Sequence, residues 1–582
     1  MQKIIRRRQS PITETNFSDS LHPLLQHIYA ARGVCSDDQI QTELSALLSP
    51  QALKGLPEAI ELLITALEQQ QRLLIVGDFD ADGATSSALA VLALTAMGAE
   101  SVNFLVPNRF EYGYGLTPEI VEVAKQFSPD LIITVDNGIS SIDGVNAANA
   151  AGIKVLVTDH HLPGEQLPAA AAIVNPNQPG CEFSSKNLAG VGVIFYLMSV
   201  LRSTLRQRQW FQQQNIAEPV MADYLDLVAL GTVADVVPLD KNNRILVAQG
   251  LRRIRAGKTR PGIKALLRFG NRSSDRVVST DLAFAVGPRL NAAGRLDDMT
   301  LGIQCLLTDD DHLANDIARQ MDELNQDRKS IEASMQREAL EALKTLDVEE
   351  GNMPYGLCLY EANWHQGVIG ILASRIKDRY HRPVIVFADT DENDVIKGSA
   401  RSISGLHIRD VLDAVASQHP GLLTKFGGHA MAAGMSLQKD QYSIFAQAFD
   451  QQVRHQLSEE HLQAELCSDG ELLANHFTLD VAQLLRDAGP WGQRFPEPLF
   501  DGEFLLLQQR ILKEKHLKMV LAVESQPQLA IDAIAFNVDI SQWEDQTIDR
   551  VRVAYKLDVN EFRGRQTLQM MVEYIEPVYS IC

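Results

Sequence analysis

The region from about residue 72 to residue 240 alternates short apolar runs with amphipathic stretches of helical length. The apolar runs include RLLIVGD, DLIITVD, KVLVTDHH and AAIVNP, and the stretches between them include SSALAVLALTAMGA and GVNAANAAG. Strand-length runs separated by helices are typical of a parallel sheet with helices on both faces. We therefore predict an α/β fold whose ligands bind at the carboxyl ends of the strands.

The 582-residue chain is too long for a single core, and later segments predict further modules. Neither Gly nor Pro occurs between Ile303 and Glu350, where apolar residues recur at helical spacing, so we expect a long connecting helix. A second α/β segment, from about Tyr355 to Asp450, contains two glycine-rich turns, KGSARS and FGGHAMAAG. Beyond Asp469, five alternating stretches predict a β-barrel of the OB type, a common single-strand binder.

These observations predict five modules along the chain. We expect an N-terminal helical extension at residues 1–70, the parallel-sheet domain at 71–300, the linker helix at 301–350, the second α/β domain at 351–460 and the barrel at 465–582.

Composition limits the location and the partners. No stretch approaches the roughly 18 to 20 apolar residues that span a bilayer, and the opening MQKIIRRRQS has no apolar signal core, so we expect a cytoplasmic protein without membrane contact. Six cysteines without CxxC spacing indicate neither a zinc knuckle nor a disulfide framework. The net charge of −21 argues against a polyanion partner, although local arrangement decides binding. The basic, acid-free stretch from Leu251 to Arg272 fits either phosphate contacts or a solvated helix face.

Three alternating carboxylates follow the first predicted strand. Asp78, Asp80 and Asp82 place hard oxygen ligands at one strand end, which suits Mg²⁺ or Mn²⁺. An EF-hand calcium loop starting at Asp78 would need Glu at its twelfth position, but Leu89 stands there. The motif therefore favours a different type of metal site.

Further candidate ligands follow later apolar runs. Asp136 follows ITV, the group Asp159, His160 and His161 closes LVTDHH, and Asp235 ends ALGTVAD, which we interpret as a fourth strand. Taken alone, Asp136 fits a helix cap as well as a ligand, and an isolated Asp235 would more often be a structural cap than a ligand. Adjacent histidines in an extended chain point apart, so we expect one to bind metal and the other to face the substrate. Because four strand ends deliver such groups to one sheet edge, we predict a two-metal site for phosphodiester or phosphoanhydride hydrolysis.

Phosphate-binding candidates lie downstream. Arg289 and Arg295 occur among small residues in VGPRLNAAGRLDD, where a guanidinium could grip phosphate, although a structural salt bridge is an equal alternative. His365 and His429 lie in glycine-containing segments that we expect to precede helices and to expose amide donors.

The chain contains the motifs DFDADG, ITVDNG, VTDHH and GTVAD in this order. In these motifs it resembles the DHH phosphoesterase superfamily. The segments PNRFEYGYGL, VNPNQP, GPRLNAAGRLDD, WHQGVIGILASR, GSARS and FGGHAMAAG resemble its RecJ branch. The resemblance extends from about residue 70 to the C-terminus. It implies a 5′→3′ exonuclease specific for single-stranded DNA that releases 5′-mononucleotides in recombination, mismatch repair and base-excision repair.

The resemblance also implies roles for individual residues. Two divalent ions, Mg²⁺ or Mn²⁺, would be held by a ligand set comprising Asp78, Asp80, Asp82, Asp136, His160 and Asp235. The residues implied in catalysis are Asp159, His161 and Arg289. Those implied in substrate binding are Arg109, Arg295, His365, Ser399, Arg401, Gly428 and His429.

Partners and alternatives complete the hypothesis. The resemblance implies single-strand-binding protein and a repair helicase as partners of a monomer. A hydrolase of pyrophosphate, cyclic dinucleotides or short oligonucleotides would share the core motifs but would need no barrel. A non-catalytic scaffold, as in a eukaryotic replication protein that resembles RecJ, would have lost metal ligands, whereas the full set stands here.

Overall fold

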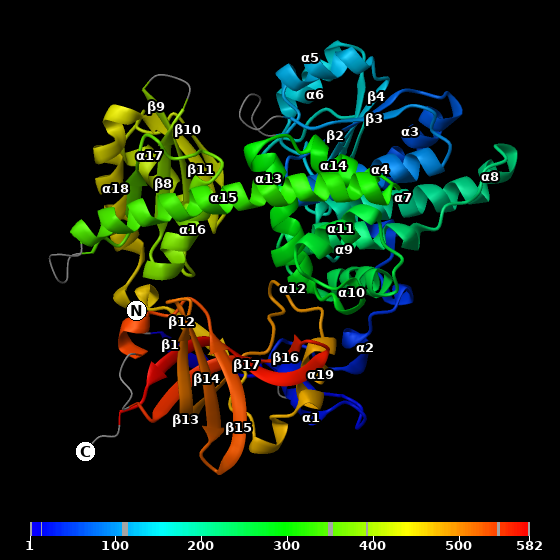
Figure 1. Cartoon of the computed structure of the whole chain (residues 1–582). Helices are drawn as coiled ribbons and strands as arrows, with labels where there is room; N and C mark the ends of the chain where they lie inside the picture. Colours follow the sequence, from blue (N-terminus) through cyan, green and yellow to red (C-terminus); the bar gives the residue numbers. More distant parts are fainter. Residues whose placement is uncertain are drawn as a thin grey trace. The chain divides into compact units, whose positions relative to one another are not determined.

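The structure is a computed structural model that describes residues 3–12, 14–107, 115–346, 353–390, 394–543 and 548–579. Its internal contacts divide the chain into two compact units. Unit 1 comprises Met1–Arg7 and Gln326–Ser468, and unit 2 comprises Arg8–Asn325 and Asp469–Cys582. The long helix α15 (Asp311–Leu346) runs through the boundary between them (Figure 1).

Unit 2 contains the predicted parallel sheet. In spatial order its strands are β3 (Val102–Leu105), β2 (Leu73–Gly77), β4 (Leu131–Val135), β5 (Lys154–Thr158) and β6 (Ala172–Val174). All neighbouring pairs are parallel. β2 and β4 are buried along their whole length, because helices cover both faces of the sheet.

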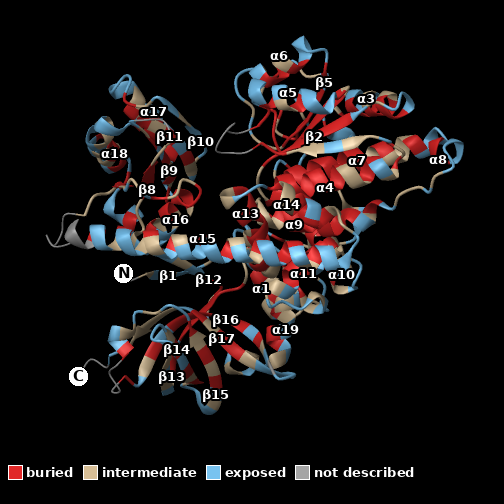
Figure 2. Ribbon diagram, turned by 45° about the horizontal axis from the view of Figure 1, so that its top comes forward, coloured by how far each residue is buried: buried red, intermediate tan, exposed pale blue. Residues whose placement is uncertain are grey.

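Alternate side chains of the strands enter two different cores. Leu74 and Val76 pack with α5 (Pro118–Ala124) and α6 (Ile142–Ala150). Leu73 and Ile75 join a larger core with α3 (Leu56–Glu68), α4 (Ala81–Ala96) and α7 (Gly190–Gln207). Figure 2 shows that α4 and α7 are largely buried, so the helix that follows the first acidic motif is fixed in the core.

Further helices complete unit 2. They are α1 (Pro23–Ala30), α2 (Asp37–Ile40), α8 (Trp210–Gln213), α9 (Leu225–Ala234), α10 (Lys241–Arg255), α11 (Pro261–Phe269), α12 (Ser279–Asp281), the π-helix η6 (Leu282–Val286), α13 (Gly287–Leu296), α14 (Thr300–Leu307) and α19 (Leu479–Asp487).

The long connecting helix begins later than the sequence predicts. Helix α14 ends at Leu307, and α15 starts only at Asp311. The break contains neither Gly nor Pro. Instead, the Asp310 carboxylate accepts hydrogen bonds from the amides of His312 and Leu313, so a capping side chain starts a new helix.

Unit 1 is a second α/β module. Its five-stranded sheet has the order β10 (Lys425–Gly428), β11 (Ala432–Gln438), β9 (Val395–Arg401), β8 (Val384–Asp389) and β7 (Leu357–Tyr360). Its helices include α16 (Ile369–Tyr380), α17 (Ile408–Gln418) and α18 (Tyr442–Gln456). A separate pair of parallel strands joins β1 (Ile4–Arg7) to β12 (Glu465–Ser468).

Two predictions for this module are wrong. KGSARS is not a turn but part of strand β9, where the Phe387 ring occupies the space beside Gly398 that a side chain would need. FGGH precedes a strand rather than a helix, because β10 and β11 form an antiparallel hairpin. WHQG does lead into helix α16, as predicted.

The predicted barrel is confirmed. Strands β13 (Phe500–Leu512), β14 (His516–Val523), β15 (Gln526–Ala535), β17 (Arg565–Pro577) and β16 (Arg550–Phe562) close in that order. Only the β15–β17 pair is parallel. The fold class is therefore confirmed, whereas the residue limits of the five modules stay predictions.

Four of the eight basic residues between Leu251 and Arg272 are paired with acids. Arg252, Arg253, Arg260 and Arg272 form ion pairs with Glu43, Asp223, Asp226 and Asp281, respectively. These contacts favour a structural face over a path for phosphates. Among the described residues, no helix combines the length and the hydropathy that a bilayer crossing requires.

Candidate metal centre

Most of the predicted acidic residues lie at the carboxyl edge of the parallel sheet. Asp78 directly follows β2, Asp136 follows β4, and the Asp159-His160-His161 segment follows β5. Asp235 differs from the prediction because it ends helix α9 rather than a strand. The apolar run before it is helical and buried nearly all round, and such a run cannot be told from a buried strand by its pattern alone.

Asp80 and Asp82 hold the turn into helix α4. The Asp80 carboxylate caps the helix by accepting hydrogen bonds from the amides of Asp82 and Gly83, at 2.9 and 3.0 Å. Asp82 is fully buried, and its two carboxylate oxygens accept hydrogen bonds from the amides of Gly190 (2.6 Å) and Val191 (3.0 Å). The first acidic motif is thus fixed by α4 and by the start of α7.

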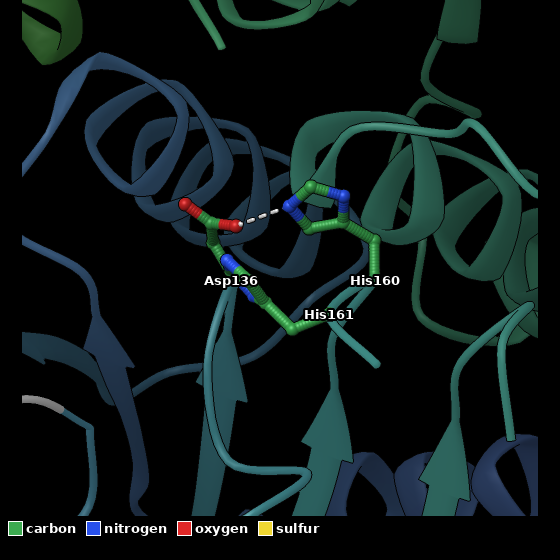
Figure 3. Close-up of side chains that lie close together, drawn as sticks. All are labelled: Asp136, His160 and His161. Atoms are coloured by element: carbon green, nitrogen blue, oxygen red, sulfur yellow. Dashed lines mark ion pairs between the residues drawn. The ribbon is translucent and has the colours of Figure 1, made fainter. Parts of the chain in front are cut away.

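Asp136 lies at the centre of the cluster. Its backbone has a φ of 62°, a left-handed conformation that Asp and Asn adopt more readily than most residues. His160 Nε2 lies 3.1 Å from Asp136 Oδ1, 3.4 Å from Asp235 Oδ2 and 3.9 Å from Asp82 Oδ2. Figure 3 shows the His160 ring directed at the Asp136 carboxylate. Residues from β4, β5, α4 and α9 therefore converge on one point.

Asp159 organises the two histidines. Its Oδ1 accepts hydrogen bonds from the amides of His160 (2.7 Å) and His161 (3.1 Å), and it lies 2.8 Å from His161 Nδ1. Its Oδ2 accepts a hydrogen bond from the amide of Ile139. This carboxylate is completely buried and points at protein donors, which fits a supporting role beside the metal ligands.

The cluster concentrates negative charge in a buried place. Burial, and next the charge of Asp80, raises the pKa of Asp82 to about 7. Burial and the neighbouring carboxylates also raise the pKa values of Asp136 and Asp235 well above the usual range. A bound cation would stabilise the ionised form of these carboxylates, because it would neutralise their mutual repulsion.

Asp159 and His161 shift each other's pKa in opposite directions. Burial acts to raise the pKa of Asp159, but the hydrogen bond and charge of His161 outweigh it and lower that pKa. Burial likewise opposes protonation of His161, yet Asp159 and the charges of Asp78 and Asp80 raise its pKa to about 9. These neighbouring carboxylates therefore favour the protonated form of His161.

The donor atoms fit divalent cations. Three groups have one ligand atom per residue, all within 4.8 Å of one another: Asp78, Asp80 and Asp136; Asp82, His160 and Asp235; and Asp136, His160 and His161. Asp136 belongs to two of these groups and His160 to two. Mostly carboxylate oxygens with imidazole nitrogen suit Mg²⁺ or Mn²⁺.

The two predicted phosphate-binding arginines, Arg289 and Arg295, both lie in helix α13. The Arg289 guanidinium donates to the carbonyls of Ala285 and Phe269 and lies 2.7 Å from the Asp322 carboxylate. It is only 8% exposed, so the salt-bridge alternative describes this state, and its catalytic role stays a prediction. Arg295 lies in the last turn of the same helix, and its role is also untested.

Most of the other substrate-binding candidates gather in unit 1. Ser399 and Arg401 lie two residues apart on β9, and the Arg401 guanidinium donates to Ser399 Oγ at 3.1 Å. Gly370 lies against both side chains, because a Cβ there would be within 3 Å of each. Residues of the β10–β11 hairpin, which contains Gly428 and His429, pair with β9 beside them. His365 precedes α16, and Arg109 lies outside the described residues.

The sequence interpretation missed residues that make this packing possible. A Cβ on Gly190 would lie 2.7 Å from Asp136 Cβ, and one on Gly231 would lie 2.7 Å from Asp82 Oδ1. Asn291 Oδ1 accepts a hydrogen bond from the amide of Ala81. The small residues in LAGVG and ALGTVAD were the available signal for close backbone approach.

Comparison with known proteins places this architecture in a family. Three family models match the chain: the DHH family N-terminal domain at residues 72–232, the DHHA1 domain at 353–455 and the RecJ OB domain at 468–574. The single-stranded-DNA-specific exonuclease RecJ of Dickeya dadantii is 55% identical over 579 residues, which cover 99% of this chain and 100% of that protein. The chain belongs to the RecJ family. RecJ of Escherichia coli is 54% identical with the same coverage.

Solved structures agree with this assignment. RecJ from Thermus thermophilus in complex with Mn²⁺ superposes with a TM-score of 0.77 at 28% identity, covering 97% of this chain and 80% of that one. The Mg²⁺ complex from the same organism gives a TM-score of 0.72 at 27% identity, with 96% and 75% covered. The predicted family and fold are thus confirmed for this RecJ-family chain.

Proposed function

We propose that this protein is a metal-dependent exonuclease that degrades single-stranded DNA from the 5′ end and releases 5′-mononucleotides. The observation that carries the proposal is the shared ligand cluster at Asp136, in a chain 55% identical over its length to a single-stranded-DNA-specific exonuclease. The 5′ polarity, and the place in recombination, mismatch repair and base-excision repair, rest on the resemblance to RecJ.

The ligand groups divide the work between two cation positions. Asp78 and Asp80 would hold one divalent ion and Asp82, His160 and Asp235 the other, with Asp136 shared. Two divalent ions bound there would supply Lewis acidity for in-line attack of water on a phosphodiester. Both Mg²⁺ and Mn²⁺ suit these ligands.

The side chains around the ligands would bind and orient the phosphate. His161 would donate a hydrogen bond to the scissile phosphate, while Asp159 fixes its ring. Arg289 would join it on leaving Asp322. We assign substrate contacts to the predicted set Arg109, Arg295, His365, Ser399, Arg401, Gly428 and His429.

The barrel would hold the strand, because OB barrels bind single strands by stacking and charge. Single-strand-binding protein, a repair helicase and a monomeric state belong to the same proposal.

The test times nucleotide release from single strands labelled at either end, with Mg²⁺, Mn²⁺ or chelator. We expect release from the 5′ label first, and only with metal. Asp136→Asn keeps the shape and suits the left-handed backbone, so it should reduce the rate by more than about 100-fold without unfolding the chain.

The matched control is Asp130→Asn at the opposite end of β4. Asp130 is half-exposed and its carboxylate binds Arg72, so this variant should retain full activity. Release from the 3′ label first would reverse the proposed polarity. Faster hydrolysis of a dinucleotide than of a long strand would assign the site to the small-nucleotide hydrolases instead.

A further inference from the structure

The β5–β6 ladder ends beside the two histidines. The last paired residues are Thr158 and Val174, and the Asp159 amide still donates to the Val174 carbonyl. The next residues after β6 are Asn175 and Pro176. Because proline has no backbone N–H, β6 cannot continue the ladder along His160 and His161.

Beyond the end of the ladder, two asparagine side chains donate hydrogen bonds to the carbonyls of the two histidines. Asn177 Nδ2 donates to the His160 carbonyl at 2.6 Å and to the Lys186 carbonyl at 3.2 Å. Asn175 Nδ2 donates to the His161 carbonyl at 3.0 Å. Asn175 is fully buried, and its Oδ1 accepts a hydrogen bond from the Asn177 amide at 2.7 Å, which couples the two side chains.

The His160-His161 backbone is therefore held from both sides. Asp159 binds the two amides, and the asparagines bind the two carbonyls. The peptide planes of a dipeptide fixed in this way cannot rotate freely, and the position of the His160 ring follows from them. That ring must lie within about 3 to 4 Å of Asp136, Asp235 and Asp82 at once.

We infer that Asn175 and Asn177 are positioning residues for the metal centre. They act through the backbone carbonyls of the two histidines. The inference rests on the proposed function, because it assumes that His160 binds a divalent ion. It assigns to VNPNQP a role that the sequence pattern alone left without a mechanism.

The test compares Mn²⁺ binding by full-length Asn177→Ala and wild-type protein, using calorimetry and the electron paramagnetic resonance of free Mn²⁺. Loss of a group that supports a metal ligand typically weakens metal binding about 10- to 100-fold, and we expect that range. The kcat at limiting Mn²⁺ should fall, saturating Mn²⁺ should restore it, and KM for the strand should not change.

Asn149→Ala is the matched control. Asn149 Nδ2 also donates to a backbone carbonyl, that of Ala169 at 2.9 Å, but on the exposed surface of α6. This variant should bind Mn²⁺ like the wild type. Asn177→Asp, which keeps the shape but faces the His160 carbonyl with an acceptor, should weaken Mn²⁺ binding at least as much as Asn177→Ala and covers the case that Asn177→Ala does not fold.

The outcomes are distinct. Unchanged Mn²⁺ affinity in both folded Asn177 variants, with lowered thermal stability only, would overturn the positioning role. Absence of Mn²⁺ binding by the wild-type protein would overturn the proposed function itself.

Discussion

Asp136 can occupy its central position only because residue 190 has no side chain. A Cβ on Gly190 would lie within 3 Å of three Asp136 atoms, two of them Cα and Cβ, which cannot move without the backbone. We expect Gly190→Ala to displace the shared carboxylate and to slow nucleotide release about 10- to 100-fold while the protein stays folded. Steady-state kinetics with circular dichroism checks both parts.

Gly192→Ala is the control for that prediction. It lies two residues on in the same helix, and the atom nearest to its added methyl would be Leu188 Cδ2, the flexible end of that side chain, at 3.0 Å. Alanine also favours the helical state. If Gly192→Ala lost as much activity as Gly190→Ala, the loss would reflect helix α7 rather than the approach to Asp136.

The Asp159–His161 pair predicts an unusual titration. In metal-free protein, NMR should place the pKa of His161 at about 9, and Asp159→Asn should move it down toward the ordinary value of about 6.5, because the negative charge beside the ring is lost. His161→Gln assigns the resonance. Because the folded-state pKa of His161 is raised and that of Asp159 is lowered, this pair stabilises fully between about pH 4 and about pH 6.5, and the contribution is lost as pH rises through about 9. A His161 pKa that Asp159→Asn leaves unchanged would contradict the pairing.

Among the elements, the barrel offers an aromatic pair where the chain leaves β15. Phe536 is 50% exposed, and the His516 ring lies edge-on to it at 5.0 Å. His516 Nδ1 accepts a hydrogen bond from the Asn537 amide, which fixes that ring. Exposed Lys513 and Lys515 lie in the adjoining β13–β14 turn. Stacking surfaces beside positive charge are typical of single-strand binders.

We expect Phe536→Ala to weaken binding of oligo(dT), in the inactive Asp136→Asn background, by at least about fivefold. The loss should disappear with an abasic strand, because no base remains to stack. Fluorescence anisotropy measures both ligands. Leu507→Ala, an exposed apolar change on β13, serves as the control. An equal loss with the abasic strand would exclude stacking on Phe536.

The sequence predicted secondary-structure elements well where one pattern of apolar residues dominated the segment. Buried apolar runs predicted β2, β4 and β5, and alternation predicted the barrel strands. It failed at Asp235, because a helix buried on all sides has the same composition as a buried strand, and at KGSARS, because a glycine inside a strand looks like a turn. The Asn175 and Asn177 contacts depend on which carbonyls lie nearby, and no local pattern encodes that.

At the scale of the whole molecule, the cores are separate. In unit 2 a continuous apolar cluster runs from the parallel sheet through α7 and α9 into the barrel. Unit 1 has two clusters of its own, on either side of its sheet. The metal ligands Asp78, Asp136 and Asp235 all belong to unit 2. Cation binding should therefore stabilise one unit and not the other.

Hydrogen exchange with and without Mn²⁺ tests this expectation. At 100 times Kd, a ligand that binds only the folded state stabilises it by about 2.7 kcal/mol, so globally exchanging amides of β2, β4 and β5 should exchange up to about 100-fold more slowly. Amides of β8 and β9 in unit 1 should keep their rates. Asp136→Asn should abolish the difference, since the shared ligand is lost. Equal protection of β8 and β9 by Mn²⁺ would mean that the two units unfold together, and the separation of their cores would then carry no energetic meaning.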